Sequence, residues 1–479
     1  NTGRVITGNI VLNGIGAPGG TDNPNKAFAH GIYIDDNAAQ VEISGNTVGN
    51  CATYGIFIHN AHDIAIKQNT VYNNAVQLLM EHDNVAADKP IYNCTVTGNI
   101  FFAKQTNQLA AEYKTKDNDI ANFGNFDNNS YYRPLDNDLT IGVLQQVNGA
   151  YSYKTLSVES WKALYGKDAG STKSSHNIPA YSVTKVTGSN QFSNGAFENN
   201  AGGLYAYASA NNCTTGWDNG HLDGGALKVS FSSASNSANY GSVIIGVGAV
   251  TAGKNYRLKF SMLGGNGNKA ITAYLRQSGG GYSDLSERKA ATITGIRQEK
   301  EYLFTATATE GNASIVFDVP EHPSPLYLDN IKLEQVDATL TNPDQYISFL
   351  YNTTTSTKSY SISQSYDAAG TSYSGSIKLN PFPEPSRKIV DHVDFISVRA
   401  DYTTLEFPKS DNEFRKIKYD RTYRPKSFAV KFYGRNETYP FTEFNTSFVL
   451  TSPPTVSVAL FGPYQRRKKF FRSFTSLRF

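Results

Sequence analysis

The stretches GIYIDDNAAQVEISGNTVGN (31–50) and GIFIHNAHDIAIKQNTVYNN (55–74) repeat one pattern with an offset of 24 residues. In each stretch apolar and polar residues alternate, and Gly, Asn and Asp separate the short runs, as expected for strands joined by tight turns. A third run, QLLM, begins 22 residues further on, at Gln77. This period is typical of a solenoid, whose turns stack because no single turn buries its own apolar face.

Asparagine recurs at one point of the repeat, at Asn9, Asn46, Asn69 and Asn99. The spacings of 37, 23 and 30 residues indicate a basic turn that carries loop insertions. In stacked parallel strands an amide side chain can hydrogen-bond to the amides above and below it. The sequence therefore predicts an internal asparagine ladder.

The strand ends carry titratable residues. Aligning the three runs on their apolar pairs, in which alternate residues point inward, places Asp35, His59 and Glu81 in one column, and His82 follows Glu81. Rungs of a parallel stack lie about 4.8 Å apart. Titratable groups at such a short distance shift one another's pKa and suit general acid–base chemistry. We predict these four residues as the catalytic candidates.

Three interpretations of this column stay open. Asp35 and Glu81, two rungs apart, would be separated by roughly 10 Å, near the upper end of the range of about 6.5–9.5 Å for inverting glycosidases. Elimination of a uronide would instead need a base such as His59 or His82 and a neutraliser such as bound calcium. Finally, solvated turns are rich in Asp, Asn and His for structural reasons alone.

Residues 1–180 resemble the right-handed parallel β-helix repeat (pectate-lyase-like) family. The segment TLSVESWKALYGKDAGSTKSS (155–175) is similar to a Trp-x-x-x-x-Gly-x-Asp-x-x-Ser segment that follows such helices in secreted bacterial polysaccharide-acting proteins. It reads locally as a short helix with a Ser N-cap and a closing Gly, and we expect it to cap the solenoid. Because the chain opens inside a repeat, we also expect that N-terminal turns and a secretion signal precede it.

Residues 188–337 carry short strands at intervals of roughly 8–14 residues, a rhythm that predicts an antiparallel β-sandwich. They resemble the CenC-like carbohydrate-binding module family, a jelly roll, in FSNGAFENN (192–200), TTGWDNG (214–220), VTAGKNYRLKFSM (250–262) and LYLDNIKLEQ (326–335). The resemblance implies a structural calcium held by Glu198 and Asp329. Two carboxylates at strand ends also suit a hard cation in their own right.

Exposed aromatic rings are the platforms on which sugar rings stack. Tyr205, Tyr207, Trp217 and Tyr240 lie in Gly- and Asn-rich surroundings of this module, and we predict that they bind carbohydrate. For Trp217, a place in the sandwich core is an equal alternative.

Residues 338–383 alternate strands and turns and predict a small β-rich C-terminal domain. The segment 384–479 is basic and nearly free of glycine. One interpretation is a basic anchor that binds an acidic polymer or a membrane surface. The other is a region without regular structure.

Bulk composition excludes several classes of protein. The net charge of +3 over 479 residues does not provide the concentrated basic face of a nucleic-acid-binding protein. Three sparse cysteines predict neither a disulfide framework nor a zinc site, and no apolar run is long enough for a membrane span. The two resemblances imply an all-β, secreted protein that acts on a polysaccharide, and we expect it to be monomeric and to act by hydrolysis. The alternatives are a lyase and a non-catalytic carbohydrate-binding surface protein.

Overall fold

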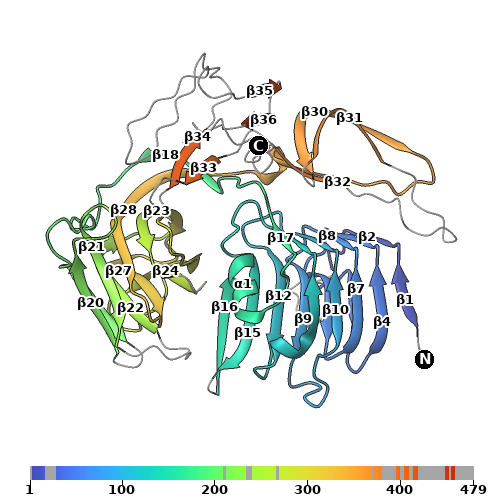
Figure 1. The fold of residues 1–479 in the computed structure, drawn as a ribbon, viewed down its shortest axis with the longest axis horizontal. Coiled ribbons are helices and arrows are strands. Elements are labelled where there is room, and N and C mark those ends of the chain that lie inside the picture. Colours follow the sequence, from blue (N-terminus) through green and yellow to red (C-terminus); the bar gives the residue numbers. More distant parts are fainter. Residues whose placement is uncertain are drawn as a thin grey trace, which may run out of the picture.

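The computed structural model describes residues 3–16, 28–147, 149–208, 212–232, 240–265, 269–368 and 371–379, together with five short strands between residues 395 and 458. The described residues form a parallel β-helix, an antiparallel β-sandwich and a smaller antiparallel sheet (Figure 1). The predicted all-β fold class is confirmed.

Three parallel sheets form the walls of the β-helix, and each turn of the chain contributes one strand to each wall. The first sheet contains β1 (Arg4–Thr7), β4 (Ala39–Ser44), β7 (His62–Lys67), β10 (Cys94–Thr97) and β13 (Gly124–Asp127). The second contains β2 (Ile10–Leu12), β5 (Thr47–Gly49), β8 (Thr70–Tyr72), β11 (Ile100–Phe102), β14 (Ser130–Tyr132) and β17 (Thr172–Lys173). The third contains β3 (Ile32–Ile34), β6 (Tyr54–His59), β9 (Val76–His82), β12 (Leu109–Thr115), β15 (Ile141–Val147) and β16 (Ala150–Leu156), of which only the β15–β16 pair is antiparallel.

The third sheet has the predicted register. Ile32 pairs with Ile56, and Ile56 pairs with Leu78. These three residues belong to one buried cluster that runs along the inside of the solenoid. The stack therefore gives each turn the apolar cover that it lacks by itself.

A ladder of asparagine amides runs beside this core through Asn9, Asn46, Asn69, Asn99 and Asn129, all of them buried except the exposed Asn9. At each step the Oδ1 of one asparagine accepts both the backbone N–H and the side-chain amide of the asparagine one turn earlier, at 2.9–3.0 Å. The predicted ladder is thus present, and it has a fifth member that the sequence alignment did not include.

The cap segment ends this ladder. Asn129 donates its backbone N–H to Ser171 Oγ (2.8 Å) and its amide to Asp168 (3.0 Å). The buried Asp168 also accepts from Trp161 Nε1 (2.7 Å) and from Ser171 Oγ (2.6 Å). Trp161 lies in α1 (Val158–Tyr165), which ends at Gly166 with a left-handed φ of 63°. The Trp, Gly, Asp and Ser of the segment therefore each have a defined part in closing the solenoid.

Two antiparallel sheets form the sandwich. One contains β18 (Tyr181–Val186), β20 (Cys213–Asp218), β21 (Ala226–Phe231), β23 (Asn255–Leu263), β26 (Gln298–Thr305) and the long β28 (Leu326–Leu340). The other contains β19 (Leu204–Ala208), β22 (Tyr240–Val250), β24 (Ala270–Gln277), β25 (Lys289–Thr292) and β27 (Glu310–Pro320). An apolar cluster between the two sheets forms a second core, separate from that of the β-helix.

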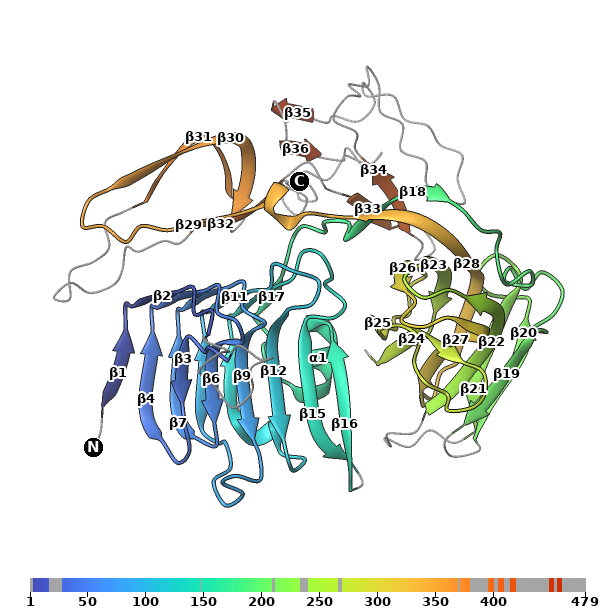
Figure 2. The same ribbon diagram turned by 180° about the vertical axis from the view of Figure 1, so that it is seen from behind.

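The sandwich lies beyond the α1 and β16 end of the β-helix, as both views show (Figure 2). Thr292 Oγ1 is 2.7 Å from Ser157 Oγ and 2.8 Å from Ser160 Oγ, all of them buried. Nearby, Lys300 donates to Asp138 at 2.7 Å. Polar contacts therefore join the sandwich directly to the cap of the solenoid.

The C-terminal sheet contains β29 (Ile347–Leu350), β30 (Lys358–Ala368), β31 (Thr371–Leu379) and β32 (Phe395–Arg399). After the short helix η3 (Pro343–Gln345), Phe349 stacks on Tyr72 of the β-helix with ring centroids 4.4 Å apart. The two interpretations of residues 384–479, a basic anchor and a segment without regular structure, stay predictions. Within this segment, β32 pairs with both β29 and β30. Two hairpins follow, β33–β34 (Thr404–Pro408 and Phe414–Lys418) and β35–β36 (Phe448–Thr451 and Thr455–Val458).

The described part of the chain contains no helix long and apolar enough to cross a membrane. Its three cysteines are free thiols, with Cys51 and Cys94 buried and Cys213 half-buried.

We expect Asn69→Ala to lower the free energy of unfolding of the β-helix by roughly 2–4 kcal/mol, because it leaves several buried backbone and amide groups without partners. Urea unfolding followed through Trp161 fluorescence, in a Trp217→Phe background, measures this change. Asn125→Ala, at an exposed position on β13, is the matched control and should change stability by no more than about 0.5 kcal/mol. Equal effects of the two substitutions would contradict a structural role for the ladder.

Candidate functional site

The predicted polar column lies on the outer face of the third sheet. Asp35 directly follows β3, whose Ile34 pairs with Ile58, and His59 pairs with Glu81. Because successive strand residues point to opposite faces, Asp35, His59 and Glu81 project away from the core. The structure therefore brings together three of the four predicted catalytic residues.

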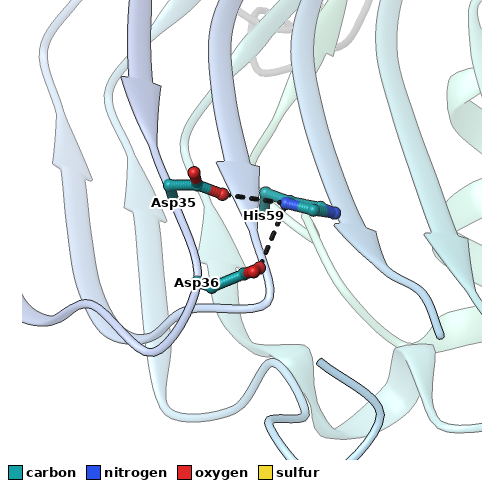
Figure 3. Close-up of side chains that lie close together, drawn as sticks. All are labelled: Asp35, Asp36 and His59. Carbon is teal, nitrogen blue, oxygen red and sulfur yellow. Dashed lines mark hydrogen bonds and ion pairs between the residues drawn. The ribbon is translucent and has the colours of Figure 1, made fainter. Parts of the chain in front are cut away.

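Carboxylates lie beside both nitrogens of the His59 imidazole, and Figure 3 shows the two beside Nδ1. Its Nδ1 lies 3.0 Å from Asp35 and 3.2 Å from Asp36, while its Nε2 lies 3.2 Å from Asp83. The Tyr33 hydroxyl donates to Asp35 at 2.6 Å. Both ring nitrogens thus face acceptors, which an imidazole satisfies when both are protonated.

The pKa of His59 follows from this arrangement. Burial lowers it, but the hydrogen bonds and charges of Asp35 and Asp83 outweigh burial, so the pKa of His59 is raised above its usual value. Near neutral pH, His59 is therefore better suited to hold Asp35 in place than to accept a proton from a substrate.

Asp35 and Glu81 have opposite pKa shifts. Hydrogen bonds from Tyr33 and His59 lower the pKa of Asp35. Burial raises the pKa of Glu81, and the attraction of Lys114 and His59 only partly offsets this effect. Two carboxyl groups whose environments separate their pKa values can divide the roles of base and acid.

The next rung adds two charged residues that the sequence alignment missed. Lys114 pairs with Glu81 in the register of β9 and β12, and its Nζ lies 3.0 Å from Glu112. Burial lowers the pKa of Lys114, but Glu112 and Glu81 outweigh it and raise the pKa. The alternation of Glu112, Tyr113 and Lys114 was the available signal, but the insertion before β10 hid its register.

An aromatic cluster adjoins these charges on the same sheet. The ring of Tyr33 stacks on Phe57 at 4.8 Å, and His30 stacks on Tyr54 at 5.0 Å with an interplanar angle of 1°. Tyr33 is 43% exposed, so its ring is accessible from solvent. Aromatic surface next to titratable groups is the usual make-up of a sugar site.

His82 lies on the other side of the strand. It has the same parity as Leu78 and Met80 on β9, and it is buried. The structure therefore separates His82 from Asp35, His59 and Glu81, because a one-residue step along a strand reverses the face.

In the sandwich, three of the four predicted aromatic residues share one sheet. Tyr205 and Tyr207 project outward from β19, and Tyr240 opens the adjacent β22. They are 63%, 47% and 40% exposed. Trp217 lies instead on β20 in the opposite sheet, where its Nε1 donates to the Phe197 carbonyl at 2.7 Å. At 42% exposed it is not a core residue.

Polar groups extend the tyrosine face across the sheet. Tyr207 pairs with Ser242, and Ser242 pairs with Asp318 and donates to it at 2.5 Å. Arg288 lies 3.2 Å from Asp318 and covers the ring of Tyr274 at 3.9 Å. The face thus combines exposed rings with fixed donors and acceptors.

The predicted cation ligands of the sandwich have unequal surroundings. Asp329 is 1% exposed, and burial, together with the charge of Asp223, raises its pKa to about 6. Its oxygens accept from the backbone and the amide of Asn330. Glu198 is exposed. A buried carboxylate next to a second acid suits a divalent cation, so Asp329 fits such a group better than Glu198 does.

Comparison with protein families supports the first domain. Residues 3–123 match the family model described as "Right handed beta helix region", and the predicted resemblance to parallel β-helix proteins is confirmed for these residues. No curated protein matches the chain.

Solved structures similar to part of the chain include three carbohydrate-binding modules. One is described as "CBM4 structure and function", with 21% identity, coverage of 28% of this chain and 94% of that one, and a TM-score of 0.24. The N-terminal cellulose-binding domain of Cellulomonas fimi β-1,4-glucanase C has 20% identity, coverage of 30% and 95%, and a TM-score of 0.24. TmCBM61 with β-1,4-galactotriose has 17% identity, coverage of 30% and 98%, and a TM-score of 0.24.

Proposed function

We propose that this protein is a secreted, monomeric polysaccharide-binding protein whose β-helix hydrolyses glycosidic bonds. The observation that carries the proposal is the pair Asp35 and Glu81. They lie on the outer face of one sheet beside the exposed ring of Tyr33, and their pKa values are shifted in opposite directions. General acid–base catalysis needs one ionised and one protonated carboxyl group at the same pH.

Glu81 is the proposed general acid and Asp35 the proposed general base. Two rungs of a parallel sheet separate them by about 10 Å, close to the separation of about 6.5–9.5 Å that leaves room for a water molecule in inverting enzymes. His59 is the positioning residue for Asp35, which it contacts at 3.0 Å.

The charge of the face favours a neutral sugar over a uronide. The face carries the carboxylates of Asp35, Asp36, Glu81, Asp83 and Glu112, whereas its cations are His59 and Lys114. An anionic polymer would be repelled by this excess of acid unless a bound cation intervened. Moreover, His59 is already surrounded by acceptors and His82 faces inward, so neither histidine is well placed as the base for elimination.

The tyrosine face of the sandwich is the proposed second contact with the polymer. A binding face held close to the catalytic face would raise the effective concentration of substrate there.

We expect the intact chain to release reducing ends from a neutral polysaccharide, without the ultraviolet absorbance of unsaturated sugars. Glu81→Gln and Asp35→Asn should each lower kcat by about 10²–10⁴-fold, because each removes a proton-transfer group. A panel of neutral and uronate polysaccharides, assayed for both signals, provides the measurement. Glu42→Gln, a half-exposed carboxylate on the first sheet paired with Lys67, is the matched control.

The pH profile and the product separate the alternatives. Activity should fall below the lowered pKa of Asp35 and above the raised pKa of Glu81, and the product should have the inverted anomeric configuration by NMR. Absorbance from unsaturated sugars would indicate a lyase instead. Binding without either signal would leave a non-catalytic carbohydrate-binding protein.

Tyr207→Ala and Tyr205→Ala should each weaken binding to a soluble neutral polysaccharide by roughly tenfold, because each removes a stacking surface worth about 1 kcal/mol or more. Isothermal titration calorimetry in the catalytically impaired Glu81→Gln background measures the affinity. Trp217→Phe, on the opposite sheet, should leave it unchanged. The reverse pattern would move the sugar site to the Trp217 face.

We also propose that the sandwich binds a structural calcium ion through Asp329, with Glu198 as the weaker candidate ligand. Because the folded-state pKa of Asp329 is raised to about 6, its protonated form stabilises the sandwich below pH 4, and this contribution is lost as pH rises through about 6. In chelator, stability should therefore fall over this interval, and calcium should restore it at pH 7.5 but not at pH 4.5. Calorimetric unfolding of Asp329→Asn should show neither effect, and an unchanged response would refute the assignment.

A further inference from the structure

A buried histidine lies behind the proposed catalytic face without a hydrogen bond. The side chain of His82 is 1% exposed, and neither ring nitrogen has a hydrogen-bond partner among the described residues. Buried polar side chains in ordered structures are nearly always hydrogen-bonded, so such a group calls for an explanation, which can be an ion.

Two carboxylates from the loop after β12 approach this imidazole. Asp117 Oδ2 lies 3.7 Å from His82 Nδ1, and one ligand atom each of His82, Asp117 and Asp119 lies within 4.8 Å of the other two. His82 is thus buried on the inner side of β9, with its imidazole close to a pair of acids from the loop.

The loop that carries the acids is fixed by its own hydrogen bonds. Thr115 Oγ1 accepts the backbone N–H of Asp117 at 3.0 Å and donates to Asp119 at 2.6 Å. The Asp117 carbonyl in turn accepts the N–H of Gln146 at 2.7 Å. The acids are therefore held near His82 independently of any ion, as preorganised ligands should be.

We propose that His82, Asp117 and Asp119 bind one divalent transition-metal ion, with Zn²⁺ as the representative ion. In a tetrahedral site with bonds of about 2.0–2.1 Å, ligand atoms lie about 3.3 Å apart, so the present arrangement needs shifts of no more than about 1 Å. One imidazole nitrogen with two carboxylates suits Zn²⁺ or Mn²⁺ better than Ca²⁺, which prefers oxygen ligands throughout.

Lys116 is the competitor for this site. Its ammonium group donates to both carboxylate oxygens of Asp117, at 2.9 and 3.1 Å. An ion would have to displace this ammonium from at least one oxygen. Lys116→Ala should therefore tighten metal binding, whereas a structural ion pair with no metal role would show no such effect.

The second cluster of possible ligands, Asp35, Asp36 and His59, is a poorer candidate. Both nitrogens of His59 already face carboxylates, and its pKa is raised, so a metal would compete with protons for the imidazole. This cluster supplies matched control variants of the same residue types.

An ion at His82 would join two rungs of the solenoid. Glu81 immediately precedes His82 on β9, and Lys114 is close in sequence to the loop that carries Asp117 and Asp119. Binding would fix the ends of β9 and β12, on which the proposed acid and its lysine neighbour lie. The site is distinct from the proposed catalytic groups, and its existence does not depend on their activity.

Calorimetric titration of the full chain with Zn²⁺, after removal of metals by chelator, tests the proposal. We expect one site per chain, an affinity reduced by about tenfold or more in His82→Gln and Asp117→Asn, and a tighter site in Lys116→Ala. His59→Gln and Asp36→Asn should bind as the unmodified chain does. Zn²⁺ should also raise the unfolding temperature of the unmodified chain but not that of Asp117→Asn.

Substitution with Co²⁺ gives an independent readout, since its visible absorption reports nitrogen and oxygen ligation. Loss of this absorption in His82→Gln would support the site. Absence of saturable binding, or binding lost in His59→Gln but retained in Asp117→Asn, would overturn it. If His82→Gln fails to fold, Asp117→Asn decides, because Asp117 is 48% exposed in its side chain and its substitution leaves the core intact.

Discussion

The column of asparagine amides from Asn9 to Asn129 is the constraint on which the rest of the β-helix depends. Each amide satisfies a backbone N–H and a side-chain donor of the previous turn, so turns of unequal length are held in one register. Loops can lengthen between rungs without disturbing this column. Asp168 and Ser171 then provide the acceptors that a further asparagine would have supplied, which lets the solenoid end without an unpaired buried donor.

This register determines what each face of the third sheet carries. Because the rungs are fixed, neighbouring residues on β9 lie on opposite faces of the sheet and in different environments. Glu81 lies outside with Asp35 and His59, while His82 lies inside near the loop acids. A slip of one residue would exchange the two sets. The opposed pKa shifts of Asp35 and Glu81 therefore follow from the stacking of the strands as much as from the identity of the residues.

The sequence predicted the rungs because Ile, Gly and Asn recur at a short period, and it predicted the outer column because alternation assigns faces. The same alternation predicts that His82 points inward with Leu78 and Met80. Because His82 directly follows Glu81 in the chain, it was instead grouped with the outer residues. Lys114 was not predicted because the insertion before β10 lengthens the turn, so that its rung could not be aligned with the three earlier ones. The opposite positions of Trp217 and Tyr207 depend on strand pairing in the sandwich, which local patterns do not specify.

One small group of hydroxyls links the two domains. Ser157 accepts the N–H of Ser160 as the N-cap of α1, and both hydroxyls contact Thr292 of the sandwich. The residue that starts the cap helix thus also contacts the neighbouring domain, and separating the domains would exchange these buried hydrogen bonds for bonds to water. A flexible linker would let the tyrosine face sample many orientations, whereas this junction restricts them. A polymer bound to the sandwich would consequently meet the β-helix in a limited set of orientations, which raises effective concentration more than tethering alone does.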